Sequence, residues 1–238
     1  MATAAGRQKM VGAVLGRKAA TPAPESPLEL TVLDQVIFSI CREDSLQEKA
    51  EAAFRNLQTR FFDWNEVRVS STAELMEALA GLSNSRGRAE RITAFLQEHF
   101  EATFAFDLEG LLKKGVKGTS KQLEKAAGLN DFTLAWVNQR ALKAQTIPID
   151  SSMLRCAKRL ELVDETEDKM APARESLEGI VAKTKVVDFT DGLSRIAVEF
   201  CHERNPACAS CPMSGECPSA KAPKGASATA AAKARKPK

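Results

Sequence analysis

Four of the six cysteines lie within 17 residues near the end of the sequence, and this cluster limits the possible fold more than any other feature. They follow the spacing Cys-x6-Cys-x2-Cys-x5-Cys and are Cys201, Cys208, Cys211 and Cys217. A Cys-x2-Cys step puts two sulfurs on one tight turn, so four thiolates this close can converge on one metal centre. Disulfides are disfavoured because the sequence shows no secretory signal. The residues alone leave structural zinc and a [4Fe–4S] cluster open.

The charge is divided unevenly along the chain. Residues 1–24 contain four basic residues and no acidic one, and the stretch from Pro218 onward contains six basic residues and no acidic one. Because the whole chain carries +3, the part between them carries −7. Basic tails on an acidic body suit the capture of a polyanion, and any DNA site on the body must then be a local positive patch. The alternative is that the tails only increase solubility.

The spacing of apolar residues predicts an all-helical protein. With 44% hydrophobic and 27% charged residues, the chain is expected to be globular. No apolar run approaches the roughly 20 residues of a membrane span, so we expect no membrane partner. Ser26-Pro27 is typical of a helix start, and Ser71-x-x-Glu74 and Thr119-x-x-Gln122 have capping-box spacing. We expect a disordered basic tail at 1–25, a helical body at 26–200 with a hairpin at about 119–144, the cysteine loop at 201–217, and a second basic tail at 218–238. An organelle transit peptide is a weaker interpretation of the first tail.

The cysteine spacing resembles the cluster loop at the C-terminal end of endonuclease III and its adenine-glycosylase relatives. The local sequence from Asn205 to Pro212 is also similar to theirs. The resemblance implies a two-lobed helical helix-hairpin-helix (HhH-GPD) glycosylase fold and favours a [4Fe–4S] cluster over zinc. In that family the cluster supports structure and DNA docking and does not catalyse. The first loop of the cluster usually carries several cationic residues in that family, and this chain keeps Arg204 there. Cys41 and Cys156 lie in apolar helical contexts and are expected to be buried, inert thiols.

A second stretch, from Leu123 to Arg155, resembles the family hairpin and catalytic loop. Gly128-Leu129-Asn130 takes the place of the hairpin's Gly-apolar-Gly. Gly128 keeps the first glycine, and asparagine at the second tolerates positive φ. Such a hairpin directs backbone N–H groups and a helix N-terminus at a phosphate. A plain helical hairpin packed on the core is the alternative for these residues alone.

Asp150 takes the position of the family's catalytic aspartate, and Arg155 that of an arginine five residues later. Asp150 also stands where a helix N-cap belongs, so capping alone would explain it. A fixed carboxylate near C1′ stabilises the oxocarbenium ion that forms when an N-glycosidic bond breaks. The base must first be flipped out of the duplex.

The main departure from the family lies 18 residues before Asp150. Members that also cut the strand carry a lysine there, whereas this chain has Phe132, which cannot form a Schiff base. Lys121 and Lys143 are expected to be solvated surface residues.

Weaker similarities to other segments of the family add three arginines to the expected DNA contacts. Arg86 and Arg88 lie in a loop that resembles a family DNA-contact loop, and ordinary surface charge is the alternative. Cys41 replaces the family's glutamine wedge, so Arg42 is the candidate to fill the space left by a flipped base. The full set of expected DNA-binding residues is Gly128, Leu129, Asn130, Arg42, Arg86, Arg88, Arg155 and Arg204.

Together these features predict a base-excision-repair DNA glycosylase that acts on a damaged or mismatched base in double-stranded DNA, with AP-lyase activity doubtful. The alternative is a non-catalytic DNA-binding relative that senses lesions or structures. We expect a monomer in the cytoplasm, associated with the nucleoid, and the sequence also allows an organelle or a nucleus.

Overall fold

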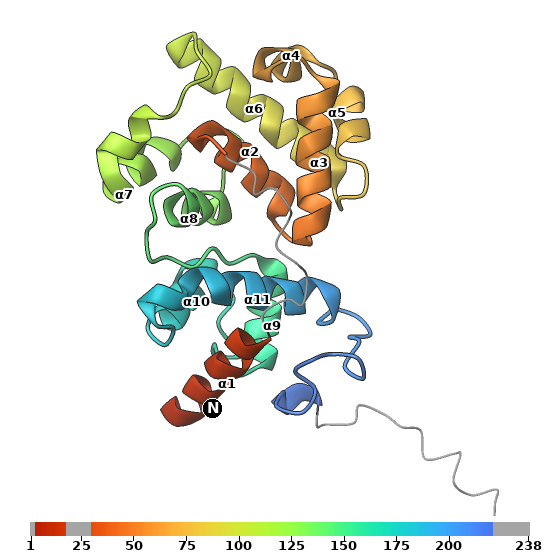
Figure 1. Ribbon diagram of the computed structural model, residues 1–238, viewed down its shortest axis with the longest axis vertical. Coiled ribbons are helices and arrows are strands. Elements are labelled where there is room, and N and C mark those ends of the chain that lie inside the picture. Colours follow the sequence, from red (N-terminus) through yellow and green to blue (C-terminus); the bar gives the residue numbers. More distant parts are fainter. Residues whose placement is uncertain (1–2, 18–29, 221–238) are drawn as a thin grey trace, which may run out of the picture.

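The computed structural model describes residues 3–17 and 30–220, and these residues are helical with no strand among them. Two groups of helices lie one above the other in Figure 1. The helices are α1 (Ala4–Gly16), α2 (Val32–Arg42), α3 (Gln47–Arg60), α4 (Trp64–Val69), α5 (Thr72–Ala78), α6 (Ser85–Thr103), α7 (Gly110–Leu123), α8 (Asp131–Arg140), α9 (Ser151–Arg159), α10 (Met170–Glu178) and α11 (Val186–Glu199), with short 3-10 turns at Lys183–Lys185 and Pro218–Ala220. The expected all-helical, two-lobed fold is therefore confirmed.

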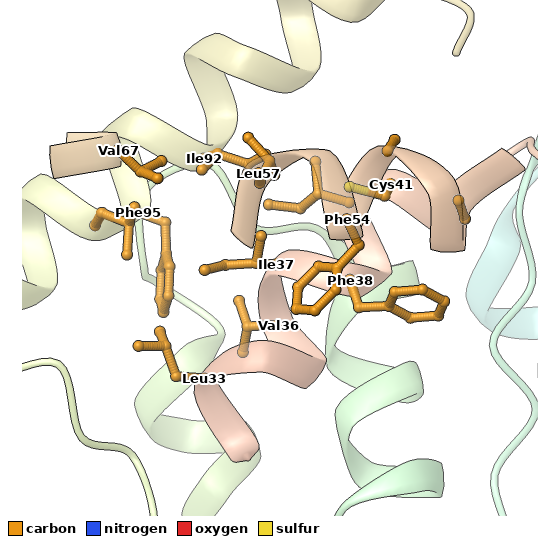
Figure 2. Packing of buried hydrophobic residues seen from close by; sticks show 14 of the residues in the cluster. Leu33, Val36, Ile37, Phe38, Cys41, Phe54, Leu57, Val67, Ile92 and Phe95 are labelled. Carbon is orange, nitrogen blue, oxygen red and sulfur yellow. The ribbon is translucent and has the colours of Figure 1, made fainter. Parts of the chain in front are cut away.

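The N-terminal lobe comprises α2 to α8 around one apolar cluster. Helix α2 is its centre, because ten of its eleven residues are buried. Figure 2 shows Phe38 and Phe54 side by side in this core, and their rings meet edge to face at 5.6 Å. Phe38 also contacts Trp136 of α8 at 5.8 Å. Aromatic pairs of this kind add stabilisation beyond that of the buried area.

The C-terminal lobe comprises α1 and α9 to α11 around a separate apolar cluster. Helix α1 belongs here, so the expectation of a disordered tail over residues 1–25 is wrong for Ala4–Gly16. The reason is that Val11 and Val14 are buried in the C-terminal core, which stabilises a short helix that its sequence alone would not. Residues 18–25 and most of the second tail, 221–238, lie outside the described residues.

One helix-start prediction is confirmed, one is wrong and one lies outside the described residues. The Ser71–Glu74 capping box is present. The first body helix starts instead at a capping box of Thr31 and Asp34, while Ser26-Pro27 lies outside the described residues. Thr119 caps nothing, since it lies within α7 and donates to the Leu111 carbonyl at 3.1 Å. Helix α7 begins before Thr119, at Gly110, and consists of two shorter helices on either side of a kink at Gly115, where φ is 64°.

The lobes meet through polar groups. The Gln139 side chain of α8 donates to the carbonyl of Thr146 at 2.7 Å and to the Thr190 hydroxyl of α11 at 3.0 Å. Arg140 forms an ion pair with Asp191 at 2.5 Å, and Asp131 forms one with Arg174. We call this boundary the seam; its residues are Asp44, Asp131, Gln139, Arg140, Thr146, Asp150, Ser151, Ser152, Arg174, Thr190 and Asp191. In the part of the chain described here, no helix is both long and apolar enough to span a bilayer.

Candidate active site and nucleic-acid interface

Asp150 lies on the seam at the N-cap of α9, and its side chain is 2% exposed. One carboxylate oxygen accepts the N–H of Met153 at 2.8 Å, which is the capping bond. The other accepts the backbone N–H of Asp44 at 3.0 Å, and Asp44 belongs to the other lobe. Burial, and then the nearby charge of Asp44, raise the pKa of Asp150 to about 7, although these two N–H bonds act in the opposite direction. Asp150 is therefore both a helix cap and a titratable group near neutrality.

The hairpin lies between α7 and α8, and Gly128 fixes it to α6. Gly128 has a φ of +74°, and a Cβ there would stand 2.2 Å from the Arg91 carbonyl oxygen. The Gly128 carbonyl in turn accepts Arg91 Nε at 2.8 Å. Leu129 is partly buried against the N-terminal core. Gly128 therefore has both a conformational and a steric reason to be glycine.

Asn130 has a different role from the one its position suggested. Its φ is −140°, so it does not need the left-handed region. Instead its side chain caps α8 by accepting the Thr133 N–H at 3.0 Å. Its amide donates to Glu43 at 2.7 Å, and Glu43 also pairs with Arg91 at 2.6 Å. Asparagine replaces glycine here because capping and the Glu43 contact both require a side chain.

Two arginines expected at the DNA are buried instead. Arg42 is 3% exposed, donates to Gln47 at 2.9 Å and to the Ser45 carbonyl, and so is not available to fill the gap left by a flipped base. Arg88 is 5% exposed and donates to the carbonyls of Ser83, Glu43 and Ile40. In the structure, carbonyls at the end of α2 and in the loops accept N–H groups of both arginines, and their contact with DNA stays a prediction.

The other three arginines occupy accessible or half-buried positions. Arg86 is exposed and pairs with Glu90 at 2.9 Å, and Arg204 is exposed in the cysteine loop. Arg155 is half-buried, and its Nε donates to the Cys201 carbonyl at 2.9 Å. Their contact with DNA stays a prediction.

Phe132, at the position where the resembled family carries its Schiff-base lysine, is a core residue. Phe132 is 4% exposed and stacks on Trp136 at 5.9 Å. Lys121 and Lys143 are exposed, as expected. The Lys143 ammonium donates to the Arg140 carbonyl at 2.8 Å.

A basic strip along the first hairpin helix was missed by the sequence reasoning. Five exposed lysines lie on α7 and just after it, and none forms an ion pair with any described residue; they are Lys113, Lys114, Lys117, Lys121 and Lys125. Lys117 and Lys121 are four residues apart on α7, which places them on one helix face, and Lys125 follows in the turn after the helix. On a body of net charge −7 this is a local positive patch of the kind that DNA binding requires. Counting charge within residues 110–127 would have revealed it.

Helix α9 connects Asp150 to the cysteine loop. Arg159 at its end donates to the carbonyl of His202 at 2.7 Å and to the sulfur of Cys201 at 3.4 Å. The Arg159 carbonyl accepts the Ser219 hydroxyl at 3.0 Å. The same carbonyl accepts the Cys217 thiol at 3.7 Å, so Arg159 contacts both end cysteines of the loop.

The four loop thiols differ in how readily they form the thiolate that binds a metal. The pKa of Cys201 is lowered to about 6, first by a hydrogen bond from Cys156 and then by Arg159, and this favours the thiolate that metals bind. Burial and the charges of neighbouring loop cysteines raise the pKa values of Cys211 and Cys217, which opposes the thiolate form. The residue types fit an iron–sulfur cluster, because such clusters are held by four cysteine thiolates. However, within residues 3–17 and 30–220 no three His, Cys, Asp or Glu side chains are close enough to hold a metal ion. The thiols share one region without being clustered.

The remaining cysteines are buried as expected. Cys41 is fully buried, and burial raises its pKa to about 12, so it is an inert thiol. Cys156 is 1% exposed but donates to Cys201, a contact with the loop that its apolar sequence context did not predict.

Solved DNA glycosylase structures share this fold, although no family model matches the chain. An endonuclease III trapped on DNA as a covalent intermediate has a TM-score of 0.68 and 16% identity, over 93% of this chain and 98% of that one. A thermostable thymine-DNA glycosylase gives 0.62 and 16%, over 91% and 97%. The H. pylori 3-methyladenine DNA glycosylase bound to 1,N6-ethenoadenine gives 0.59 and 11%, over 79% and 94%. The chain has the helix-hairpin-helix glycosylase fold.

Proposed function

We propose that this protein is a DNA glycosylase of base excision repair, which hydrolyses the N-glycosidic bond of a damaged or mismatched base. The observation that carries the proposal is the place of Asp150, at the N-cap of α9 where the two lobes of a glycosylase fold meet. When ionised, its carboxylate would stabilise the positive charge that develops on the sugar and orient the attacking water. The fold likeness to endonuclease III in complex with DNA supports double-stranded DNA as the partner.

DNA binding is supported by the hairpin and by the lysine strip beside it. Gly128 and Asn130 present the hairpin loop and the start of α8, where N–H groups favour a phosphate. The ion pair of Asp131 with Arg174 reduces the repulsion that its carboxylate would exert on that phosphate. The duplex backbone would lie along the hairpin, with exposed Arg86 and Arg204 as further contacts.

The proposed enzyme is monofunctional. With Phe132 buried in the N-terminal core, the family's amine nucleophile has no counterpart at that position. Borohydride trapping on abasic DNA is expected to give no covalent adduct. An adduct would contradict this part of the proposal by revealing a lysine that acts from another position.

We further propose that Cys201, Cys208, Cys211 and Cys217 hold a [4Fe–4S] cluster. When bound, it would stabilise the C-terminal lobe without entering the bond cleavage. The anaerobically purified protein is expected to be brown, with a broad absorbance in the visible blue and equal amounts of iron and sulfide. A colourless protein that contains one zinc ion would contradict it.

The rival function is that of a non-catalytic DNA-binding sensor. One observation favours it: Asp150 is almost fully covered and both its oxygens are engaged. A substrate panel separates the two functions, using duplexes with oxidised pyrimidines, mismatched T or U, and A opposite 8-oxoguanine. Free base detected by mass spectrometry without strand scission supports the enzyme. Tight binding to a lesion with no base release from any duplex supports the sensor.

A further inference from the structure

Hydrogen bonds across the seam connect Asp44 with Asp150 and with the start of α9. The backbone N–H of Asp44 donates to the Asp150 carboxylate at 3.0 Å. In return, the Asp44 carboxylate accepts the N–H of Ser152 at 2.8 Å and the hydroxyl of Ser151 at 2.9 Å. Both carboxylates thus cap the start of α9, one from each lobe. Asp44 adopts a φ of 49°, which is a left-handed conformation.

The geometry points to Asp44 as a positioning residue for Asp150, with the two carboxyl groups acting as one unit across the seam. This inference rests on the proposed role of Asp150 and adds a second residue, from the other lobe, that the sequence did not reveal. Asp44 does not touch the reacting atoms. It acts by fixing where the Asp150 carboxylate stands and by placing a like charge beside it.

The electrostatics of the pair follow from its burial. Burial raises the pKa of Asp44, but hydrogen bonds from Ser152, Ser151 and the Asp150 side chain outweigh it, so the pKa is lowered and Asp44 stays ionised. Two carboxylates this close cannot both ionise easily, and Asp150, the more buried one, keeps the shared proton up to about pH 7. Arg42 and, behind it, Arg140 and Asp191 are the other charges that face the pair. Arg42 favours ionisation of Asp150, so Asp44 is the nearby charge that opposes it.

Two variants remove the Asp44 charge without disturbing its backbone. Asp44→Asn keeps a carbonyl oxygen for the Ser152 N–H, and asparagine tolerates positive φ. Asp44→Gly suits the left-handed conformation even better. Both keep the backbone N–H that Asp150 accepts. Asp63→Asn is the matched control, because Asp63 also caps a helix, α4, and that helix lies far from the C-terminal lobe in Figure 1.

The test follows the Asp150 carboxyl carbon by NMR as pH is varied, with the full chain labelled at aspartate and Asp150→Asn used to assign the signal. We expect a midpoint near 7 in the natural protein, a midpoint lower by about one pH unit in both Asp44 variants, and no change in the control. Single-turnover base release should move in parallel, since excision requires the ionised carboxylate.

An unchanged midpoint in both Asp44 variants would overturn the inference. The NMR titration needs no substrate, so it remains decisive even if the protein releases no base. Failure of base release alone would count against the proposed function and leave the carboxyl pair intact.

Discussion

The two lobes differ in what fills their cores. The N-terminal core contains five buried aromatic residues, including Phe38, Phe54 and Trp136, whereas the core of the described C-terminal lobe contains only Phe189 among aliphatic and sulfur-containing residues. Cys201, Cys211 and Cys217 pack against that second core. The N-terminal core is thus rich in aromatic side chains, whereas the C-terminal lobe, which carries Asp150, includes the cysteine loop in its packing.

The boundary between the lobes differs from both cores. Arg140 with Asp191, Asp131 with Arg174 and Asp44 with Ser152 connect the lobes through charge and hydrogen bonds. Exposed or half-buried pairs of this kind contribute little stability each. The seam is therefore held by polar contacts, whereas each core is apolar, and it contains the titratable Asp150.

The largest expected effect comes from deleting one aromatic ring in each core. Phe54→Ala and Phe189→Ala should each cost about 3–5 kcal/mol, because both rings are fully buried. Hydrogen exchange should show loosening in the lobe that carries the change, since the two clusters share no residue. If Phe54→Ala loosened α11 as much as α3, the lobes would form a single core.

Arg88 and Arg86 test the difference between a buried and an exposed arginine of the N-terminal lobe. Arg88→Met should cost about 2–4 kcal/mol, because buried carbonyls lose a charged donor. Arg86→Met removes only the exposed pair with Glu90 and should stay within about 0.5 kcal/mol. Urea unfolding measures both, and equal losses would show that our assignment of Arg88 to structure is mistaken.

A pair of glycines compares the hairpin with the cysteine loop. Gly128→Ala should destabilise the protein by about 1–3 kcal/mol and move the hairpin away from α6, because of its positive φ and the Arg91 carbonyl. Gly215→Ala, where a Cβ meets no atom within 4 Å, should have almost no effect. Thermal unfolding and DNA affinity measure the two variants. Normal DNA binding by Gly128→Ala would argue against the hairpin as the phosphate grip.

The lysine strip gives a smaller effect, confined to DNA binding. Changing Lys117, Lys121 and Lys125 to glutamine should weaken binding about 10-fold at 0.15 M salt and reduce the salt slope by about 2–3, because each lysine neutralises one phosphate. The matched control changes three other exposed lysines that form no ion pair with any described residue, Lys49, Lys169 and Lys183. Equal losses in the two triple variants would mean that overall charge, and no particular strip, attracts DNA.

The sequence predicts the parts of this molecule that depend on local spacing. The helices, the Ser71–Glu74 capping box, Gly128 and the Asp150 cap follow from near neighbours in the chain. It does not predict partners that folding brings together over long distances. The contact of Asp44 with Asp150 spans 106 residues, and Arg88 reaches the Ile40 carbonyl over 48. For the same reason Arg42 and Arg88 look like surface cations in the sequence, although the fold buries them.

The central claim, that Asp150 is the carboxylate that drives base release, is tested most directly by Asp150→Asn in single-turnover excision on the best substrate of the panel. Asparagine can still accept the Met153 N–H, so the cap and the fold should remain, as circular dichroism would verify. The account predicts a loss of about 100- to 1000-fold in the excision rate with DNA affinity unchanged. A rate equal to that of the natural protein would contradict it.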